Sequence, residues 1–219
     1  MNKAPVDILK NIYRLYDAQL ESVDTACQKF CSDCCTTNVT MTGLEGLLLI
    51  ESPFKEQISD ILSRVGADAP ARYRPTRTTN TYVELCRTAV EPDEDHPEGQ
   101  AGVCPFLDNG ACTVYPVRPF GCRCMISKRP CADYGFAEID DFTLTLNTVF
   151  LQFIEHLDRN GFSGNMRDVL GRLEAGSGKV PDGFQTIPNR SIPALMIPPD
   201  HRTRMADVVN RLSRLVEGL

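Results

Sequence analysis

The sequence lacks the features that mark a membrane or secreted protein. Nowhere in its 219 residues does an apolar run approach the roughly 18 residues that cross a bilayer. The first sixteen residues contain no apolar core of a signal peptide, because Asp7, Lys10 and Arg14 interrupt it. We therefore expect no membrane partner and a cytoplasmic location, where thiols stay reduced.

An excess of basic charge and a glycine-rich nucleotide motif are also missing. The formal net charge of -6 at pH 7 argues against a nucleic-acid partner, which generally requires a basic face. There is no dinucleotide fingerprint, and Gly176-Ser177-Gly178-Lys179 departs from the phosphate-loop pattern because Val180 follows the lysine. No nucleotide site is predicted.

Cysteine, by contrast, is abundant. The chain has ten cysteines, and in a reducing compartment such a set indicates metal ligands or catalytic groups rather than disulfides. Two groups stand out, and their spacings are Cys27-x3-Cys31-x2-Cys34-Cys35 and Cys104-x7-Cys112-x9-Cys122-x-Cys124. Cys86 and Cys131 stand apart from both groups.

The spacing of apolar residues predicts a mainly α fold. Helices are expected at residues 6–34, 44–50, 53–65, 80–89, 141–159, 166–173 and 203–216. Thr42 and Glu45 have the spacing of a capping box. Asp108-Asn109-Gly110 predicts one small β-hairpin between residues 103–107 and 111–115.

We expect a single domain over residues 1–219. Within it, residues 27–131 form a cysteine-cluster metal-binding core, in which a long segment rich in Cys, Pro and Gly would be held in place by the metal. Residues 141–219 form a C-terminal helical extension that packs on the core and on the first helix. Residues 175–200, rich in Gly and Pro, are expected to wrap over the surface.

The first cysteine group has a geometric meaning if the first helix continues to residue 34. At about 100° per residue, its four thiols fall on one helix face, together with Leu9, Tyr16 and Leu20. They would then point inward and meet the second group, which lies on the hairpin and on residues 116–123. The sequence therefore predicts one joint site between a helix face and a hairpin.

The adjacent pair Cys34-Cys35 bears on the identity of the metal. Neighbouring residues cannot easily both ligate one tetrahedral zinc, whereas they can ligate different irons of a cluster or different metal ions. A site of four thiolates carries a net charge of about -2. Arg118 and Arg123 lie within the ligand-rich segment and are predicted to compensate this charge.

The ordered cysteine pattern resembles the YkgJ-like CxxCxxCC family of zinc- or iron-chelating domains. The matching pieces are Cys31-x2-Cys34-Cys35, Cys104-Pro105-Phe106-Leu107, Cys112-Thr113-Val114-Tyr115 and Arg118-Pro119-x2-Cys122-Arg123, and they cover about residues 27–131. The family opens with Cys-x2-Cys, whereas three residues separate Cys27 from Cys31 here. The resemblance implies metal binding, with Cys124 and Cys131 as additions to the family pattern. Some relatives look like flagellin lysine methylases, so an enzymatic role is an alternative.

These patterns lead to one set of predicted ligands and three candidate functions. The predicted metal ligands are Cys27, Cys31, Cys34, Cys35, Cys104, Cys112, Cys122, Cys124 and Cys131. Cys86 is expected to be a bystander. We favour an iron–sulfur centre with a redox or accessory function. The alternatives are a zinc-stabilised module that binds a protein partner and a metal-dependent modifying enzyme.

Overall fold

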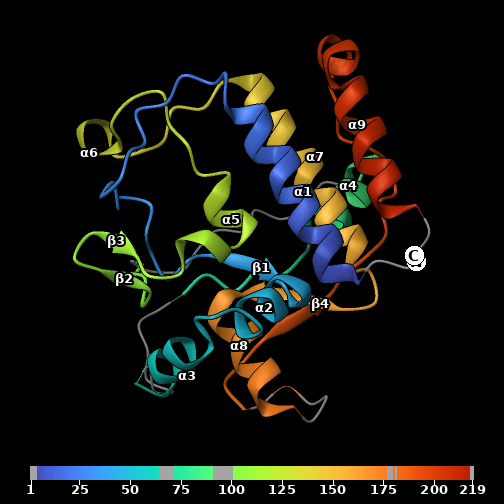
Figure 1. Ribbon diagram of the computed structural model, residues 1–219. Coiled ribbons are helices and arrows are strands. Elements are labelled where there is room, and N and C mark those ends of the chain that lie inside the picture. Colours follow the sequence, from blue (N-terminus) through green and yellow to red (C-terminus); the bar gives the residue numbers. More distant parts are fainter. Residues whose placement is uncertain (1–3, 65–71, 91–100, 177–179, 181, 218–219) are drawn as a thin grey trace.

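The protein is described from a computed structural model that covers residues 4–64, 72–90, 101–176, 180 and 182–217. About half of the chain is helical, and two small antiparallel sheets accompany the helices (Figure 1). Among the described residues, no helix has both the length and the apolar character needed to cross a bilayer.

Three long helices form the larger hydrophobic core. They are α1 (Pro5–Leu20), α7 (Asp141–Leu157) and α9 (Arg202–Val216), and they pack side by side (Figure 1). The stripe predicted on the first helix is buried, with Leu9, Ile12 and Tyr16 all 0% exposed. The prediction that the C-terminal helices pack against the first helix is therefore confirmed.

A second core lies between a three-stranded sheet and two helices. Strands β1 (Thr40–Thr42), β4 (Phe162–Asn165) and β5 (Thr186–Pro188) pair in the order β1-β4-β5, and α2 (Gly43–Ile50) packs on α8 (Met166–Ala175). The predicted capping box is confirmed, because the Thr42 side chain accepts from the Glu45 N–H and Glu45 accepts from the Thr42 N–H. The expectation of one hairpin missed this sheet, whose strands of three or four residues are too short to show alternation.

The predicted first helix is wrong beyond Leu20. Residues 21–39 form turns and extended chain, so the thiols of Cys27, Cys31, Cys34 and Cys35 do not lie on a helix face. The Thr25 hydroxyl and the Ala26 N–H both donate to the Ser127 carbonyl (3.1 Å and 2.8 Å). Thr25 also accepts from the Cys27 N–H. The hydrogen bonds to Ser127 and to the Thr25 side chain replace the backbone hydrogen bonds that a continued helix would form.

The middle of the chain contains short helices. The third helix, α3 (Lys55–Arg64), begins later than predicted, because residues 51–54 form a turn in which the Ser52 hydroxyl donates to the Leu49 carbonyl. Its predicted end at Val65-Gly66 lies outside the described residues. The predicted helix at residues 80–89 is confirmed as α4 (Thr79–Arg87).

The predicted hairpin is confirmed as β2 (Leu107–Asp108) paired with β3 (Ala111–Cys112). Its two loop residues, Asn109 and Gly110, have positive φ angles of 47° and 76°, as the Asn-Gly sequence demands. The 3-10 helix η1 (Tyr115–Val117), α5 (Phe120–Arg123) and α6 (Cys131–Tyr134) follow it. A second 3-10 helix, η2 (Pro199–His201), precedes α9.

The short helix α5 joins the cysteine-rich segment to both cores. Its first residue, Phe120, is 0% exposed, and its ring centroid lies 4.6 Å from that of Tyr16 and 5.9 Å from that of Phe150. The Phe120 N–H donates to the buried Glu45 carboxylate (2.7 Å). Gly121 lies so close to β1 that a Cβ atom would approach the Thr40 carbonyl oxygen to 2.8 Å. The cysteines on and beside α5 are therefore held against the buried Phe120, Glu45 and strand β1.

Candidate metal centre

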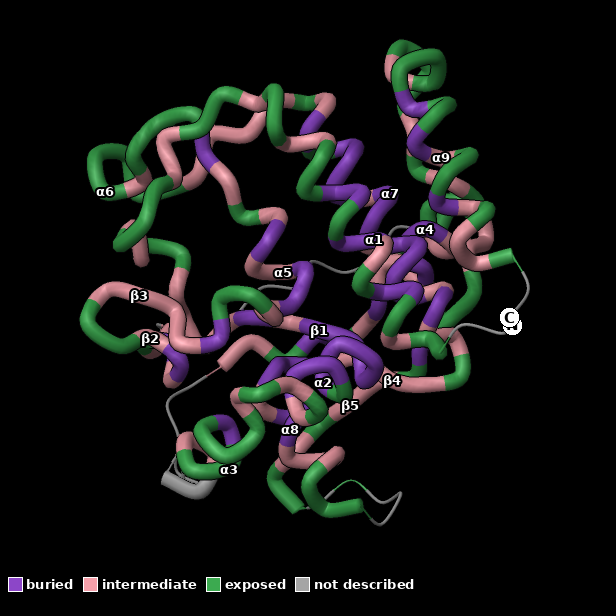
Figure 2. The backbone as a smooth tube through the Cα atoms, viewed as in Figure 1, coloured by how far each residue is buried: buried purple, intermediate pink, exposed green. Residues whose placement is uncertain are grey.

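Three segments that are far apart in the sequence come together at one side of the helical core. They are residues 25–38, 101–124 and 127–138, which include β2, β3, α5 and α6 (Figure 1). Ala26 bonds Ser127, Thr37 donates its N–H to the Gly102 carbonyl (2.9 Å), and Thr36 forms a β-bridge with Val103. Most of this region is exposed or half-buried, whereas most residues of α7 in the helical core are buried (Figure 2). We call it the cysteine lobe.

One set of four thiols packs on the second core. Cys104 is 8% exposed, and the other three are partly buried against the same apolar cluster. The set, named here the inner thiol group, is Cys35, Cys104, Cys112 and Cys122. Burial raises the pKa of the Cys122 thiol far above its ordinary value, and the nearby thiols of Cys104 and Cys112 raise it further. These four residues come from the first loop, the hairpin and α5, so the fold itself assembles the group.

A second set lies farther out, where the first loop meets α6. Burial raises the pKa of Cys31, and the neighbouring Cys27 and Cys131 thiols raise it as well. Burial also raises the pKa of Cys34 to about 11, with Cys35, Cys27 and Cys31 as further causes. We name Cys27, Cys31, Cys34 and Cys131 the outer thiol group. Cys34 is exposed and the other three are half-buried, so this group is closer to solvent.

The adjacent cysteines Cys34 and Cys35 belong to different groups. Burial, then the thiols of Cys104 and Cys112, raise the pKa of Cys35. Burial, then the thiols of Cys35, Cys27 and Cys31, raise the pKa of Cys34, which in turn raises that of Cys104. The Cys34 thiol also donates a hydrogen bond to the Cys35 sulfur. The two groups therefore touch at this pair, and the joint site predicted from the sequence stays a prediction, with Cys34 and Cys35 as the place where the groups meet.

The two remaining cysteines lie outside both groups. Cys124 packs against the larger core, and burial, with the Glu45 carboxylate and Cys34 as further causes, raises its pKa to about 12. Cys86 is exposed near the end of α4, where it shares a hydrogen bond with Tyr82 on the same helix. All ten thiols are free, so no disulfide uses up any of the predicted ligands.

Backbone N–H groups point at several of the sulfurs, a feature that sequence reasoning did not foresee. The N–H groups of Phe106 and Leu107 donate to Cys104, and that of Val114 donates to Cys112; each lowers the pKa that burial raises. In the outer group, the Asp33 N–H does the same for Cys31. Such bonds favour the thiolate form and tune thiolate-bound metals. A turn follows each of these cysteines, and that turn is the sequence signal from which these N–H to sulfur bonds could have been predicted.

The two arginines predicted to compensate charge have different surroundings. Arg118 stacks on the Tyr115 ring, with its Cζ atom 3.7 Å from the centroid, and its positive charge opposes the raised pKa of Cys112, Cys122 and Cys124. Its buried Nε has no hydrogen-bond partner among the described residues. Arg123 instead pairs with Asp17 (3.2 Å) and donates to the carbonyls of Pro116 and Arg118. Arg118 is thus the guanidinium that lies among the thiols.

The side chains of the cysteine lobe have the chemistry that a thiolate-bound metal requires. The distances between them do not match those of a metal site. Soft sulfur ligands, N–H donors to sulfur and a nearby guanidinium all suit such a centre. Within the described ranges, however, no three Cys, His, Asp or Glu side chains converge closely enough to hold one metal ion. Ligation would therefore have to draw the loops of the cysteine lobe together.

Comparison of the chain with protein-family models, with curated proteins and with solved structures finds no match. The resemblance to the CxxCxxCC family therefore stays a prediction that depends on the cysteine pattern alone.

Proposed function

We propose that this chain is a cysteine-cluster metal-binding protein that holds iron–sulfur centres for a redox or accessory function. The observation that carries the proposal is the gathering of eight free thiols, from three distant segments, into two groups of four. Four cysteine ligands are what a four-iron, four-sulfur cluster requires. The alternative is that the eight cysteines are inert and bind nothing. Free cysteines are reactive, so a cluster of eight without a shared ligand would be unusual.

The electrostatics of the inner thiol group support a charged centre there. Metal binding requires the thiolate form, and the raised pKa of Cys104 and Cys122 means that these thiols are protonated at neutral pH without metal. The N–H donors to Cys104 and Cys112, together with Arg118, offset part of the cost of a buried negative cluster. Arg118 has a buried Nε still free to donate to a sulfur.

The position of the outer thiol group favours a redox role. It lies nearer to solvent than the inner group, and the Cys34–Cys35 peptide links the two. A centre near the surface can exchange electrons with a partner, and a second centre joined to it through one peptide can pass them inward. We infer a two-centre relay in which the outer group holds the entry site.

Zinc is the second candidate. The assignment of Cys34 and Cys35 to different thiol groups removes the objection to zinc that their adjacency in the sequence raised. With the two residues in different groups, each group offers four thiols without using adjacent ligands, which suits tetrahedral zinc. Zinc sites of this kind would make the protein a stabilised interaction module. A metal-dependent modifying enzyme is the third candidate, and the cavity of about 450 Å³ between α1 and α9 does not bear on it, because its lining residues lie away from the cysteine lobe.

Anaerobic purification with elemental analysis separates these functions. We expect a brown protein that contains iron and acid-labile sulfide and that loses visible absorbance on treatment with dithionite. A colourless protein with stoichiometric zinc would replace the redox function by the zinc module. A protein that binds neither metal, even after anaerobic reconstitution, would overturn the proposal.

A further inference from the structure

Cys34 and Cys35 form a vicinal dithiol at the point where the two thiol groups meet. The Cys34 thiol donates a hydrogen bond to the Cys35 sulfur, so the two sulfurs lie within hydrogen-bonding reach of each other. Cys34 is exposed and Cys35 is half-buried, and neither is part of a disulfide. A ligand that needs two neighbouring thiols can therefore reach this pair from solvent.

Backbone hydrogen bonds hold the pair in a tight turn. The Cys35 N–H donates to the Ser32 carbonyl (2.9 Å), and the Thr36 N–H donates to the Cys34 carbonyl (3.0 Å). The Cys35 carbonyl in turn accepts from the Cys104 N–H (3.0 Å), which ties the turn to the second cysteine segment. Two ligating groups that are held together in this way lose little conformational freedom when they bind, and that loss is one of the main costs of binding.

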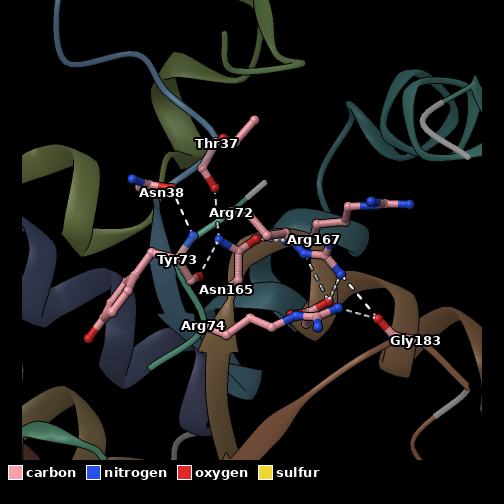
Figure 3. Close-up of polar contacts among 9 residues, drawn as sticks. Thr37, Asn38, Arg72, Tyr73, Arg74, Asn165, Arg167 and Gly183 are labelled. Atoms are coloured by element: carbon pink, nitrogen blue, oxygen red, sulfur yellow. Dashed lines mark hydrogen bonds and ion pairs between the residues drawn. The ribbon is translucent and has the colours of Figure 1, made fainter. Parts of the chain in front are cut away.

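The chain that follows the pair is anchored to the start of α8. The Asn165 side-chain amide donates to the carbonyls of Thr37 (2.7 Å) and Tyr73 (3.0 Å), as Figure 3 shows. The Tyr73 N–H donates to the Asn38 side chain (2.8 Å; Figure 3). Asn165 is 1% exposed and caps α8, so these bonds join the end of the turn to a buried part of the fold. The position of the dithiol is therefore set by the fold on both sides.

The number of sulfurs that meet at this point selects the kind of ligand. Among the residues that the structure describes, no three Cys, His, Asp or Glu side chains converge closely enough to hold one metal ion. Soft sulfur ligands select soft acceptor atoms. A trivalent arsenic atom with one organic substituent is such an acceptor, and it forms two As–S bonds while it keeps its As–C bond. It therefore needs only the two sulfurs that the turn already holds together.

We propose that Cys34 and Cys35 form a binding site for monosubstituted trivalent arsenicals. With phenylarsine oxide, two S–H bonds and the bond between arsenic and oxygen break, two As–S bonds form, and the oxygen leaves as water with both thiol protons. Arsenic stays trivalent and neither sulfur is oxidised, so the step needs no oxidant or reductant. Occupancy takes one ligand from each thiol group; that consequence rests on the proposed function, whereas the arsenical site does not.

The test is a titration of the full-length, reduced, metal-free protein with phenylarsine oxide, in which mass spectrometry of the intact chain counts the bound phenylarsenic groups. After one equivalent, iodoacetamide blocks the remaining thiols, dimercaptopropanol removes the arsenical, and N-ethylmaleimide marks the thiols that were released. We expect peptide mapping to place the N-ethylmaleimide on Cys34 and Cys35. Label on another pair of cysteines, or label spread over the whole chain, would overturn the site.

Two variants complete the test. Cys34→Ser leaves one sulfur of the pair, so the tightest binding should weaken by about a hundredfold, the scale on which a second tethered contact raises affinity. Cys131→Ser removes a half-buried thiol of the outer group and keeps the pair, so binding should not change. Circular dichroism checks that Cys34→Ser folds, and the labelling of the parent protein decides the question if it does not. Unchanged binding in folded Cys34→Ser, or an equal loss in Cys131→Ser, contradicts the proposal.

Discussion

The backbone N–H of Cys104 lies 3.0 Å from the carbonyl oxygen of Cys35, to which it donates a hydrogen bond. This bond joins the first cysteine segment to the second at the two residues whose thiols share the inner group. The neighbouring bridge from Thr36 to Val103 extends the pairing by one more step. Cys35 is thus fixed to the hairpin side of the cysteine lobe, and the thiols of Cys27 and Cys31 raise the pKa of Cys34, the residue before it.

Because the thiols divide into two groups, metal loss should be separable by mutation. Cys112→Ser removes an inner ligand, and Cys131→Ser removes an outer one. Each variant should retain about half of the metal of the parent protein, since structural cluster and zinc sites need their full ligand set. The measurement is metal and acid-labile sulfide per chain after anaerobic purification.

The matched control for these variants is Cys86→Ser. Cys86 is exposed on α4 and contacts Tyr82 rather than either group, so the metal content should not change. Complete metal loss in both Cys112→Ser and Cys131→Ser would mean that one shared centre, not two, uses the eight thiols.

Arg118 should control how readily the thiols of Cys112, Cys122 and Cys124 ionise. Its charge lowers the pKa of Cys112, Cys122 and Cys124 against the larger effect of burial. In the metal-free protein, Arg118→Gln should raise these pKa values further and slow the reaction of the thiols with a disulfide reagent. The metal-loaded variant should have a lower reduction potential, because reduction adds negative charge that is no longer offset.

Arg129→Gln provides the comparison for Arg118. Arg129 pairs with Glu138 (3.0 Å) and lies over the Tyr134 ring, so its removal changes the net charge by the same amount. Equal effects of the two variants on thiol reactivity would show that Arg118 acts only through the overall charge of the protein.

The metal-free protein should lose stability at high pH. Burial raises the pKa of Cys124 to about 12 and that of Cys122 still further, from an ordinary value of 9.0. The folded state therefore keeps protons that the unfolded state releases above about pH 9, so the free energy of unfolding falls as pH rises from there toward about pH 12. Below the unfolded-state value this contribution is fully present. Urea denaturation with a chelator and a thiol reductant measures it.

Metal binding should have the opposite pH dependence. Ligation needs thiolates, so acidification should weaken metal binding and each metal bound should release protons.

A Cys124→Ala variant tests whether Cys124 contributes to the loss of stability of the metal-free protein at high pH. It should flatten part of the decline in the free energy of unfolding above about pH 9. An unchanged decline in that variant would mean that Cys124 is not a source of it.

Phe120 should be the side chain that couples the cysteine lobe to the helical core. It is 0% exposed and contacts the rings of Tyr16 and Phe150. Phe120→Ala should lower the free energy of unfolding by about 3–5 kcal/mol, the usual cost of truncating a buried aromatic side chain. Phe136→Ala, at a residue 67% exposed, should change it by less than about 0.5 kcal/mol. Denaturant unfolding of both variants checks this, and equal effects would contradict it.

Features set by local chemistry were predictable from the sequence. The capping box of Thr42 and Glu45, the Asn109-Gly110 hairpin turn and the helix at residues 141–157 each depend on residues close together in the chain. Side-chain hydrogen bonds at a helix start, positive φ angles and a long apolar stripe leave little choice to distant contacts.

Features set by distant contacts were not predictable. An apolar stripe and the helical spacing of the cysteines continue past Leu20, yet the bonds from Thr25 and Ala26 to Ser127 end the helix there. The strand β4 exists because Thr40–Thr42 and Thr186–Pro188 pair with it on either side. The position of Cys35 beside Cys104 depends on the same kind of pairing, which no spacing rule encodes.

Mössbauer spectroscopy of the anaerobic, iron-loaded protein, combined with EPR of the reduced form, tests the central claim most directly. We expect the signals of two cysteine-ligated clusters per chain, with magnetic interaction between them in the fully reduced protein because the groups meet at Cys34 and Cys35. A spectrum without cluster iron, from a folded protein whose ten thiols remain free to react, would contradict the account.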